Sequence, residues 1–524
     1  MLRLLSNNRS VKINNGGEKH KKYLWDVIYL NIKRTNVIGI IFLVWAIVLS
    51  MGQLTICTFK GEQYSLLAVN QRIDNLAIKS RRGKLLDRKG IPLVENTVDF
   101  ASEFTGFSPV IGEPLLPVRY SKNSNACHLI GYIDGEGNGV SGLEKTFNST
   151  LIAKTYDSVN VIKDARGNVI EHMGLSYSQA KGEGDSVVLT IDAHIQKICQ
   201  DALVKRGITG AVAVMDVATF DVLAMASSPV YNQGDIGSYL EGNDGQLVNR
   251  CVSAYNAGSI FKIVTLGTAL EQSGMSKKYR CFGKTELLGH SFACHKSEGH
   301  GLQDMTDALK NSCNCSFYEM GTKVGAKKII DKAREFGLGD TIVHCTDFRE
   351  NPGNLPNKKK YNPADSVNYA IGQGEILITP IQAANMTAII ANGGVKQKSN
   401  IADSIVDYEG NLLRIVREVG QTRVLSEKHA QFIGNAMRLA VTEGTAKILK
   451  DNSARIAGKT GTAETGWIKD GKYMVHGWFC GFFPYENPRY AMAVIAENGG
   501  SGAESAAPVF GEIAEEIIKI YPIG

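Results

Sequence analysis

The chain has 524 residues, of which 44% are hydrophobic and 21% charged, a composition typical of globular proteins that bury a large core. This length predicts about two to four domains. The formal net charge of +6 comes from residues 1–34, where eight Lys and Arg stand against Glu18 and Asp26. The remaining chain is balanced, with 50 basic and 50 acidic residues. No basic surplus is left for a nucleic-acid-binding face, so nucleic acid is excluded as a partner.

A segment without charged residues follows the basic one. Residues 36–57 form a run of 22 such residues, long enough to cross a hydrocarbon core of about 30 Å. The positive-inside bias predicts a cytoplasmic segment at 1–34, a membrane anchor at 35–57 and all later residues outside the cell membrane. A cleaved signal peptide is the competing interpretation. It would have a shorter apolar region, and residues 50–53 offer no small-x-small cleavage site.

The segment around Ser259 is the first candidate for a catalytic site. A turn of small residues ending at Gly258 leads into Ser259, and an apolar helical pattern continues to Gly274. Ser259 and Lys262 are three residues apart and therefore share one face of the predicted helix. A serine hydroxyl becomes nucleophilic when a base removes its proton, and a desolvated lysine amine can be that base. Taken alone, the Ser-x-x-Lys pattern indicates a helix cap followed by a solvated lysine more strongly than it indicates a catalytic pair.

Two further motifs change this balance. Ser312-Cys313-Asn314 follows downstream, and Lys459-Thr460-Gly461-Thr462 lies nearer the C-terminus. The three motifs, in this order, resemble the serine acyl-transferase signature shared by penicillin-binding proteins and serine β-lactamases. Their joint occurrence is far more specific than any one of them.

The chain around the nucleophile is similar to class B penicillin-binding proteins. The resemblance rests on blocks at residues 81–90, 128–132, 139–145, 164–167 and 189–192, and on later blocks at 370–374, 379–382 and 443–446. It implies a dimerisation or pedestal domain at 58–190 and a transpeptidase domain at 191–524. One departure lies beside the nucleophile, where Ala257 precedes Gly258 in place of the proline common in the family.

Hydrophobic periodicity describes the second of these domains as α/β. It predicts helices at 195–205 and 507–520 and strands at 210–216, 222–227, 477–482 and 490–495. Together with this pattern, the resemblance implies an α/β (α+β) fold with a penicillin-binding protein/serine β-lactamase-like transpeptidase domain and a β-rich pedestal domain. The apolar run adds one N-terminal transmembrane helix.

The resemblance implies a role for each residue of the first two motifs. Ser259 attacks the carbonyl between two D-alanines of a peptidoglycan stem peptide, and Lys262 takes the hydroxyl proton. Ser312 relays a proton to the leaving amine. Asn314 holds Lys262 and the substrate amide.

The third motif binds substrate in this scheme. Lys459 attracts the terminal carboxylate, and the hydroxyl of Thr460 or Thr462 hydrogen-bonds it. Gly461 lets the substrate approach the strand closely. Backbone N–H groups of Ser259 and Thr462 form the oxyanion hole.

The function implied is peptidoglycan cross-linking in septal, elongation or spore wall synthesis, without a catalytic cofactor. The partners implied are stem peptides, lipid-linked precursor strands, β-lactams, the membrane and a polytopic glycosyltransferase. A β-lactam sensor is an alternative, but sensors of that kind are expected to have several membrane spans. A scaffold is another, and the complete catalytic set argues against it.

Residues 281–315 are rich in side chains that bind metals. We predict that Cys294, His300, Asp304 and Cys313 hold a structural zinc ion through two sulfurs, one nitrogen and one oxygen. Cys313 is the middle residue of the Ser-x-Asn motif, so its side chain is expected to point away from the active site. A disulfide between Cys281 and Cys294 is the alternative, since the domain is predicted to lie outside the membrane. Buried free thiols are the third.

Overall fold

The computed structural model of the chain describes residues 17–79, 81–94, 119–120, 125–153, 156–162, 166, 176–178, 183–240, 242, 245–275, 278–343, 348–469 and 472–522. The chain divides into two compact units, residues 1–77 with 158–178, and residues 78–157 with 179–524. Part of the predicted basic segment, residues 1–16, lies outside the described residues, as do 164, 165 and 167 of one pedestal block.

The first unit begins with a long helix. α1 (Gly17–Thr55) continues through the π-helical η1 (Ile56–Lys60) into α2 (Gly61–Arg72). The helical segment 21–68 is long and apolar enough to cross a membrane. All side chains of residues 21–60 are exposed. An exposed helix of this composition is stable in lipid rather than water, which supports the predicted single anchor. A three-stranded sheet follows, in the order β1 (Ile73–Lys79), β4 (Tyr156–Ile162) and β5 (Ser176–Ser178).

The second unit contains an antiparallel five-stranded sheet in the order β19-β20-β21-β7-β8. Its strands are β7 (Gly210–Asp216), β8 (Val222–Ser228), β19 (Ala457–Lys469), β20 (Lys472–Phe483) and β21 (Tyr490–Ala496). Successive side chains of β7 enter different cores, since Val212 and Val214 belong to one cluster and Ala211 and Ala213 to another. This alternation is the two-residue period of a strand that is covered on both faces. The predicted strands at 210–216, 222–227, 477–482 and 490–495 are confirmed.

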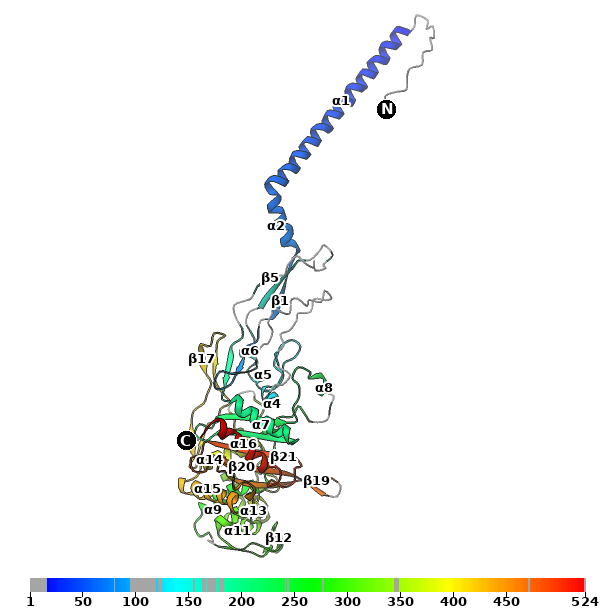
Figure 1. Cartoon of the computed structure of the whole chain (residues 1–524). Coiled ribbons are helices and arrows are strands. Elements are labelled where there is room, and N and C mark those ends of the chain that lie inside the picture. The colour runs from blue at the N-terminus through cyan, green and yellow to red at the C-terminus, as the bar shows by residue number, and fades with distance from the viewer. Residues whose placement is uncertain are drawn as a thin grey trace. The chain divides into compact units, whose positions relative to one another are not determined.

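Helices cover both faces of this sheet (Figure 1). α7 (Ala193–Lys205) and α16 (Ala506–Ile520) pack on one face, and both confirm the predicted helices. α14 (Pro380–Ala391) and α15 (Glu427–Thr442) pack on the other. The helices beyond them are α9 (Lys262–Leu270), α10 (Met305–Lys310), α11 (Asn314–Val324), α12 (Ala326–Glu335) and α13 (Pro363–Ala370).

A second five-stranded sheet collects strands from distant parts of the chain. Its order is β17 (Leu412–Ile415), β16 (Ala402–Val406), β6 (Ser186–Leu189), β2 (Leu85–Leu86) and β3 (Pro92–Val94). Beside it are the short helices α4 (Cys127–Ile130), α5 (Gly142–Thr146) and α6 (Asn148–Leu151). Glu144 is fully buried and paired with two guanidinium groups, Arg82 at 2.7 Å and Arg119. A buried carboxylate needs such partners, so this cluster fixes the 81–90 block against α5.

Two small hairpins form an excursion between α9 and α10. β10 (Tyr279–Cys281) pairs with β13 (Gly301–Gln303), and β11 (Lys284–Leu287) pairs with β12 (His290–Ala293). The remaining elements are α8 (Gly237–Leu240), η3 (Arg250–Val252), β9 (Tyr255–Asn256), η4 (Gly258–Phe261), β14 (Leu377–Ile378), β15 (Val395–Gln397), β18 (Gln421–Arg423) and η5 (Lys447–Leu449).

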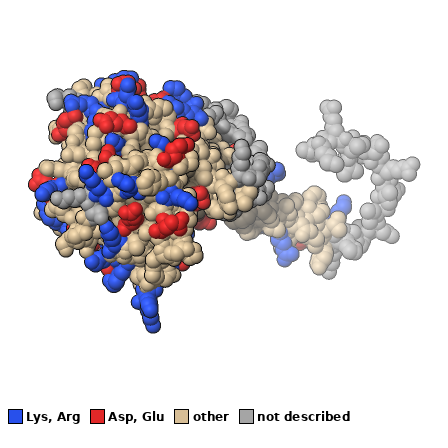
Figure 2. Space-filling model, turned by 90° about the horizontal axis from the view of Figure 1, so that it is seen from below, with Lys and Arg blue, Asp and Glu red and all other residues tan. Residues whose placement is uncertain are grey.

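The charges on the face shown in Figure 2 are mixed. Lys and Arg side chains alternate there with Asp and Glu, and no broad field of one sign covers the described residues of that face. This agrees with the balanced charge of the chain after residue 34.

Candidate active site

Ser259 lies in a tight turn that only glycine allows. Gly258 has a φ of +53°, and a Cβ at this position would lie 2.7 Å from the carbonyl oxygen of Thr462. The turn therefore packs directly on strand β19, although Ala257 replaces the proline common in the resembled family. The chain then forms the 3₁₀ turn η4, which leads into α9 at Lys262. The predicted helix is confirmed, but it begins as a 3₁₀ turn and α9 ends at Leu270.

Lys262 is fully buried and joins the first motif to the second. Its Nζ donates to the carbonyl oxygen of Ser312 at 2.8 Å, to Ser312 Oγ at 3.2 Å and to Asn314 Oδ1 at 2.6 Å. The ring of Phe317 lies 5.4 Å from the Nζ. Burial lowers the pKa of Lys262 to about 7. An amine with this pKa is half neutral near neutral pH and can accept a proton.

The turn between α10 and α11 presents the second motif. Ser312 has a φ of +55°, an unusual value for a residue with a side chain. Cys313 is the N-cap of α11, and Asn314 is the first helical residue. Ser312 and Asn314 both reach Lys262, whereas Cys313 is fully buried and faces other cysteines. The expectation that Cys313 points away from the active site is confirmed.

The third motif lies along β19, against the serine turn. A Cβ on Gly461 would lie 3.0 Å from Ile260 Cγ2 and 3.4 Å from the Ile260 N, so strand and turn meet without a side chain between them. Thr462 is exposed and Thr460 is buried. Thr460 Oγ1 is 2.8 Å from Thr445 Oγ1, a positioning contact that the motifs did not indicate.

Lys459 does not reach solvent in this structure. Its side chain is fully buried, and its Nζ donates to the carbonyl oxygen of Thr460 at 2.8 Å. Burial, and next the charge of Lys262, hold the pKa of Lys459 well below its usual range. The two lysines thus lie close enough to affect each other.

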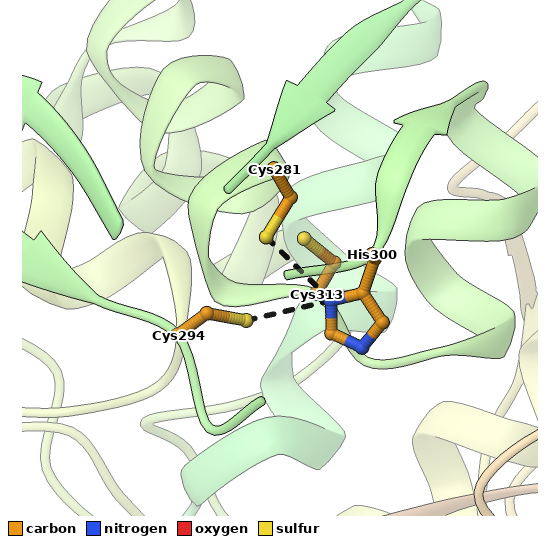
Figure 3. A group of neighbouring side chains, drawn as sticks. All are labelled: Cys281, Cys294, His300 and Cys313. Atoms are coloured by element: carbon orange, nitrogen blue, oxygen red, sulfur yellow. Dashed lines mark hydrogen bonds between the residues drawn. The ribbon is translucent and has the colours of Figure 1, made fainter. Parts of the chain in front are cut away.

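Three side chains of the excursion between α9 and α10, Cys281, Cys294 and His300, lie together with Cys313 from the turn between α10 and α11 (Figure 3). Their ligand atoms all lie within 4.8 Å of one another. His300 Nδ1 is 3.6 Å from the Sγ of Cys281 and 3.6 Å from the Sγ of Cys294. Tetrahedral zinc, with Zn–S of about 2.3 Å and Zn–N of about 2.0 Å, requires S···N separations of about 3.5 Å. The donor set therefore fits zinc.

Asp304 does not belong to this group, which corrects the predicted ligand set. Its carboxylate is the N-cap of α10 and accepts from the backbone N–H of Asp307 at 2.8 Å. Cys281 takes the fourth position instead, because β10 pairs with β13 and brings it beside His300. The expected disulfide alternative does not occur among the described cysteines, all of which are free thiols.

Two glycines allow the hairpins to close around the cluster. Gly283 has a φ of +88°, and a Cβ there would lie 1.8 Å from the carbonyl oxygen of Ser297. Gly299 has a φ of +79°, and a Cβ there would lie 2.3 Å from the carbonyl oxygen of Cys281. These close backbone approaches bring the Cys294 and His300 segments to Cys281.

Comparison with known proteins agrees with this arrangement. Residues 210–515 match the penicillin binding protein transpeptidase domain family. Stage V sporulation protein D of Bacillus subtilis is 29% identical over 458 residues, which cover 84% of this chain and 66% of that protein. The peptidoglycan D,D-transpeptidase MrdA of Acinetobacter baumannii is 30% identical over 420 residues, covering 71% of this chain and 60% of that protein. The matches thus span about two thirds or less of these relatives.

Solved structures share the fold. Penicillin binding protein 3 of Mycobacterium tuberculosis has a TM-score of 0.68 and 26% identity, over 86% of this chain and 98% of that one. A chain from a structure titled "Structural coordination of polymerization and crosslinking by a peptidoglycan synthase complex" has a TM-score of 0.67 and 23% identity, over 94% of this chain and 99% of that one.

The pKa of Lys262 predicts how the site depends on pH. Only the neutral amine can take the serine proton, so acylation of Ser259 by a penicillin should accelerate as pH rises through about 7 and then level off. Single-turnover labelling with a fluorescent penicillin from about pH 5 to about pH 9 measures this rate. A rate that stays constant, or falls, across that range would contradict the assignment of Lys262 as base.

Proposed function

Because the chain belongs to the penicillin-binding protein transpeptidase family, we propose that it is a peptidoglycan D,D-transpeptidase. It cross-links stem peptides through an acyl-enzyme on Ser259. The observation that carries this proposal is the Lys262 Nζ, held between Ser312 and Asn314 one helical turn after Ser259. The relative named a peptidoglycan D,D-transpeptidase supports the substrate class.

In the first half-reaction Ser259 Oγ attacks the carbonyl carbon between two D-alanines. The hydroxyl proton passes to the neutral amine of Lys262, whose lowered pKa keeps that form available. Collapse of the tetrahedral intermediate breaks the peptide C–N bond. Ser312, within 3.2 Å of Lys262 Nζ, relays the proton to the departing D-alanine amine. The product is an ester between Ser259 and the remaining stem peptide.

In the second half-reaction an amine from a neighbouring stem attacks this ester. The amine proton goes through Ser312 to Lys262, and the serine leaves with a proton from Lys262. A new peptide bond forms and Ser259 is restored, so no cofactor is needed for catalysis. A β-lactam enters by the same acylation step and remains on Ser259.

Residues of strand β19 bind the substrate. Thr462 is exposed beside the serine turn, and its hydroxyl or that of Thr460 hydrogen-bonds the terminal carboxylate. Lys459, whose Nζ donates to the carbonyl oxygen of Thr460, attracts that carboxylate in its ammonium form. Backbone N–H groups of Ser259 and Thr462 form the oxyanion hole, each donor contributing about 3–4 kcal/mol to transition-state stabilisation. Gly461 has no side chain to obstruct the approach.

The protein works as a single-pass membrane protein with its N-terminus in the cytoplasm, a cytoplasmic segment at 1–34, a pedestal at 58–190 and a transpeptidase domain at 191–524. The basic residues before the apolar run support this orientation. A polytopic glycosyltransferase that polymerises the strands is the proposed partner. The fold shared with a chain of a peptidoglycan synthase complex supports this choice. The sensor alternative fits less well, because among the described residues one helix is apolar enough to span a membrane.

Cys281, Cys294, His300 and Cys313 hold a structural zinc ion in this proposal. Three thiolates and one imidazole suit zinc better than harder cations. All four side chains are buried or half-buried, as structural zinc ligands are. A bound zinc would join the two hairpins of the excursion to the N-terminus of α11 and so stabilise the wall next to Ser312.

The acylation step is tested by intact mass after incubation with a fluorescent penicillin. The parent protein should gain one adduct that persists for hours, and Ser259→Ala should gain none, because the nucleophilic hydroxyl has been removed. Ser238→Ala, at an exposed serine of α8, serves as the matched control and should be labelled like the parent. Labelling of Ser259→Ala would refute the nucleophile, and rapid hydrolysis of the penicillin would favour a β-lactamase.

The metal proposal is tested by zinc content on two variants. Purified parent protein should carry one zinc per chain, and Cys281→Ser should lose it, because one of four ligands is gone. Asp304→Asn should keep its zinc and its stability, since Asn is as good an N-cap as Asp. If Asp304→Asn lost its zinc and Cys281→Ser kept it, the ligand set predicted from the sequence, with Asp304 in place of Cys281, would be correct instead.

A further inference from the structure

A cavity of about 360 Å³ lies in the second unit, lined by none of the motif residues or metal-ligating side chains. Its walls are the end of α12, the following loop at 337–342, α14 and the two-stranded ribbon of β15 and β18. The volume is within the range of sites for small molecules, about 300–1,000 Å³. It is about twelve times the share of one water in the liquid, enough for a ligand the size of a phosphorylated monosaccharide.

The charged side chains that line the cavity are mostly basic: Arg334, Lys396 and Lys398 against Asp340. Arg334 is engaged by Asp331 at 3.1 Å, and Lys398 by Glu418 at 3.7 Å.

Lys396 is the basic residue of this group without an ion pair, although Asp340 of the same lining lies near enough to affect its charge. Among the described residues it forms no ion pair within 4.0 Å, and its Nζ donates only to the carbonyl oxygen of Glu335, at 3.1 Å. It is half-buried, and burial lowers its pKa. A partly desolvated ammonium gains from a bound anion.

A buried amide with one unpartnered atom belongs to the same lining. Asn385 is 1% exposed, and its Nδ2 donates to the carbonyl oxygen of Phe336 at 2.9 Å, while its Oδ1 has no partner. A Cβ on Gly337 would lie 3.4 Å from Asn385 Nδ2 and 3.8 Å from Lys396 Nζ. The Nδ2 end of this amide and the ammonium of Lys396 therefore both lie close to Gly337, which lines the cavity.

We propose that this cavity binds a small hydroxylated anion of the sugar phosphate class. Its anionic group pairs with Lys396, and a neighbouring hydroxyl donates to the Asn385 Oδ1 after a small shift of the wall. The other polar groups of the lining, among them Thr341, Gln421 and Thr422, suit the remaining hydroxyls. The site is separate from acyl transfer and does not depend on it.

The test is calorimetric titration of the full chain in detergent micelles with glucose 1-phosphate. The parent protein should bind it, and Lys396→Met should bind it at least about tenfold more weakly, as expected when one hydrogen bond to a charged group is lost. Lys428→Met, at an exposed lysine of α15 outside the cavity, is the matched control and should bind like the parent. Labelling by fluorescent penicillin verifies that each variant is folded.

Glucose and inorganic phosphate test separately how the sugar and the phosphate group contribute to binding. Glucose should not bind detectably, and inorganic phosphate should bind more weakly than glucose 1-phosphate. No binding of glucose 1-phosphate, or equal binding by Lys396→Met, would overturn the site. Phosphate that binds as tightly as glucose 1-phosphate would overturn the sugar class. If glucose 1-phosphate does not bind but fluorescent penicillin labels the protein normally, the transpeptidase proposal is unaffected.

Discussion

A lysine without access to water determines the geometry of the candidate active site. The Lys262 Nζ can remain buried because Ser312 and Asn314 surround it with acceptors, and because the apolar helix α9 carries it into the core. Desolvation of this kind disfavours the ammonium form, so the same burial that fixes the amine also prepares it to take a proton. Strand β19 then packs on the turn at Gly258, which fixes the backbone that carries Ser259.

The turn between α10 and α11 links this site to the cysteine cluster. Ser312 and Asn314 face Lys262, while Cys313 between them faces Cys281 and the other thiols. The unusual φ of Ser312 is part of this arrangement, since the chain must direct neighbouring side chains in opposite directions within one turn. Any group that holds Cys313 therefore also restrains the two partners of the base. We infer that the cluster serves the active site through position rather than through chemistry.

Local patterns predicted the parts of the fold that depend on neighbours in the sequence. The strand at 210–216 and the helix at 195–205 follow from hydrophobic period alone. The three motifs indicated the site because each chemical role restricts the residue type. The fourth member of the Cys/His group could not be chosen, because the pairing of β10 with β13 decides that Cys281 and not Asp304 meets His300. The burial of Lys459 and the pairing of β16 with β6 also depend on contacts between distant residues, which spacing does not encode.

The central claim, that Lys262 is the base for Ser259, is tested most directly by the acylation rate of Lys262→Met. Methionine fills nearly the same volume without an amine, so the fold should survive and penicillin should still reach the site. General base catalysis contributes about 10²–10⁴-fold, and the single-turnover rate of acylation should fall by that factor. A rate within about threefold of the parent, in a folded variant, would show that another group takes the proton and would contradict the account.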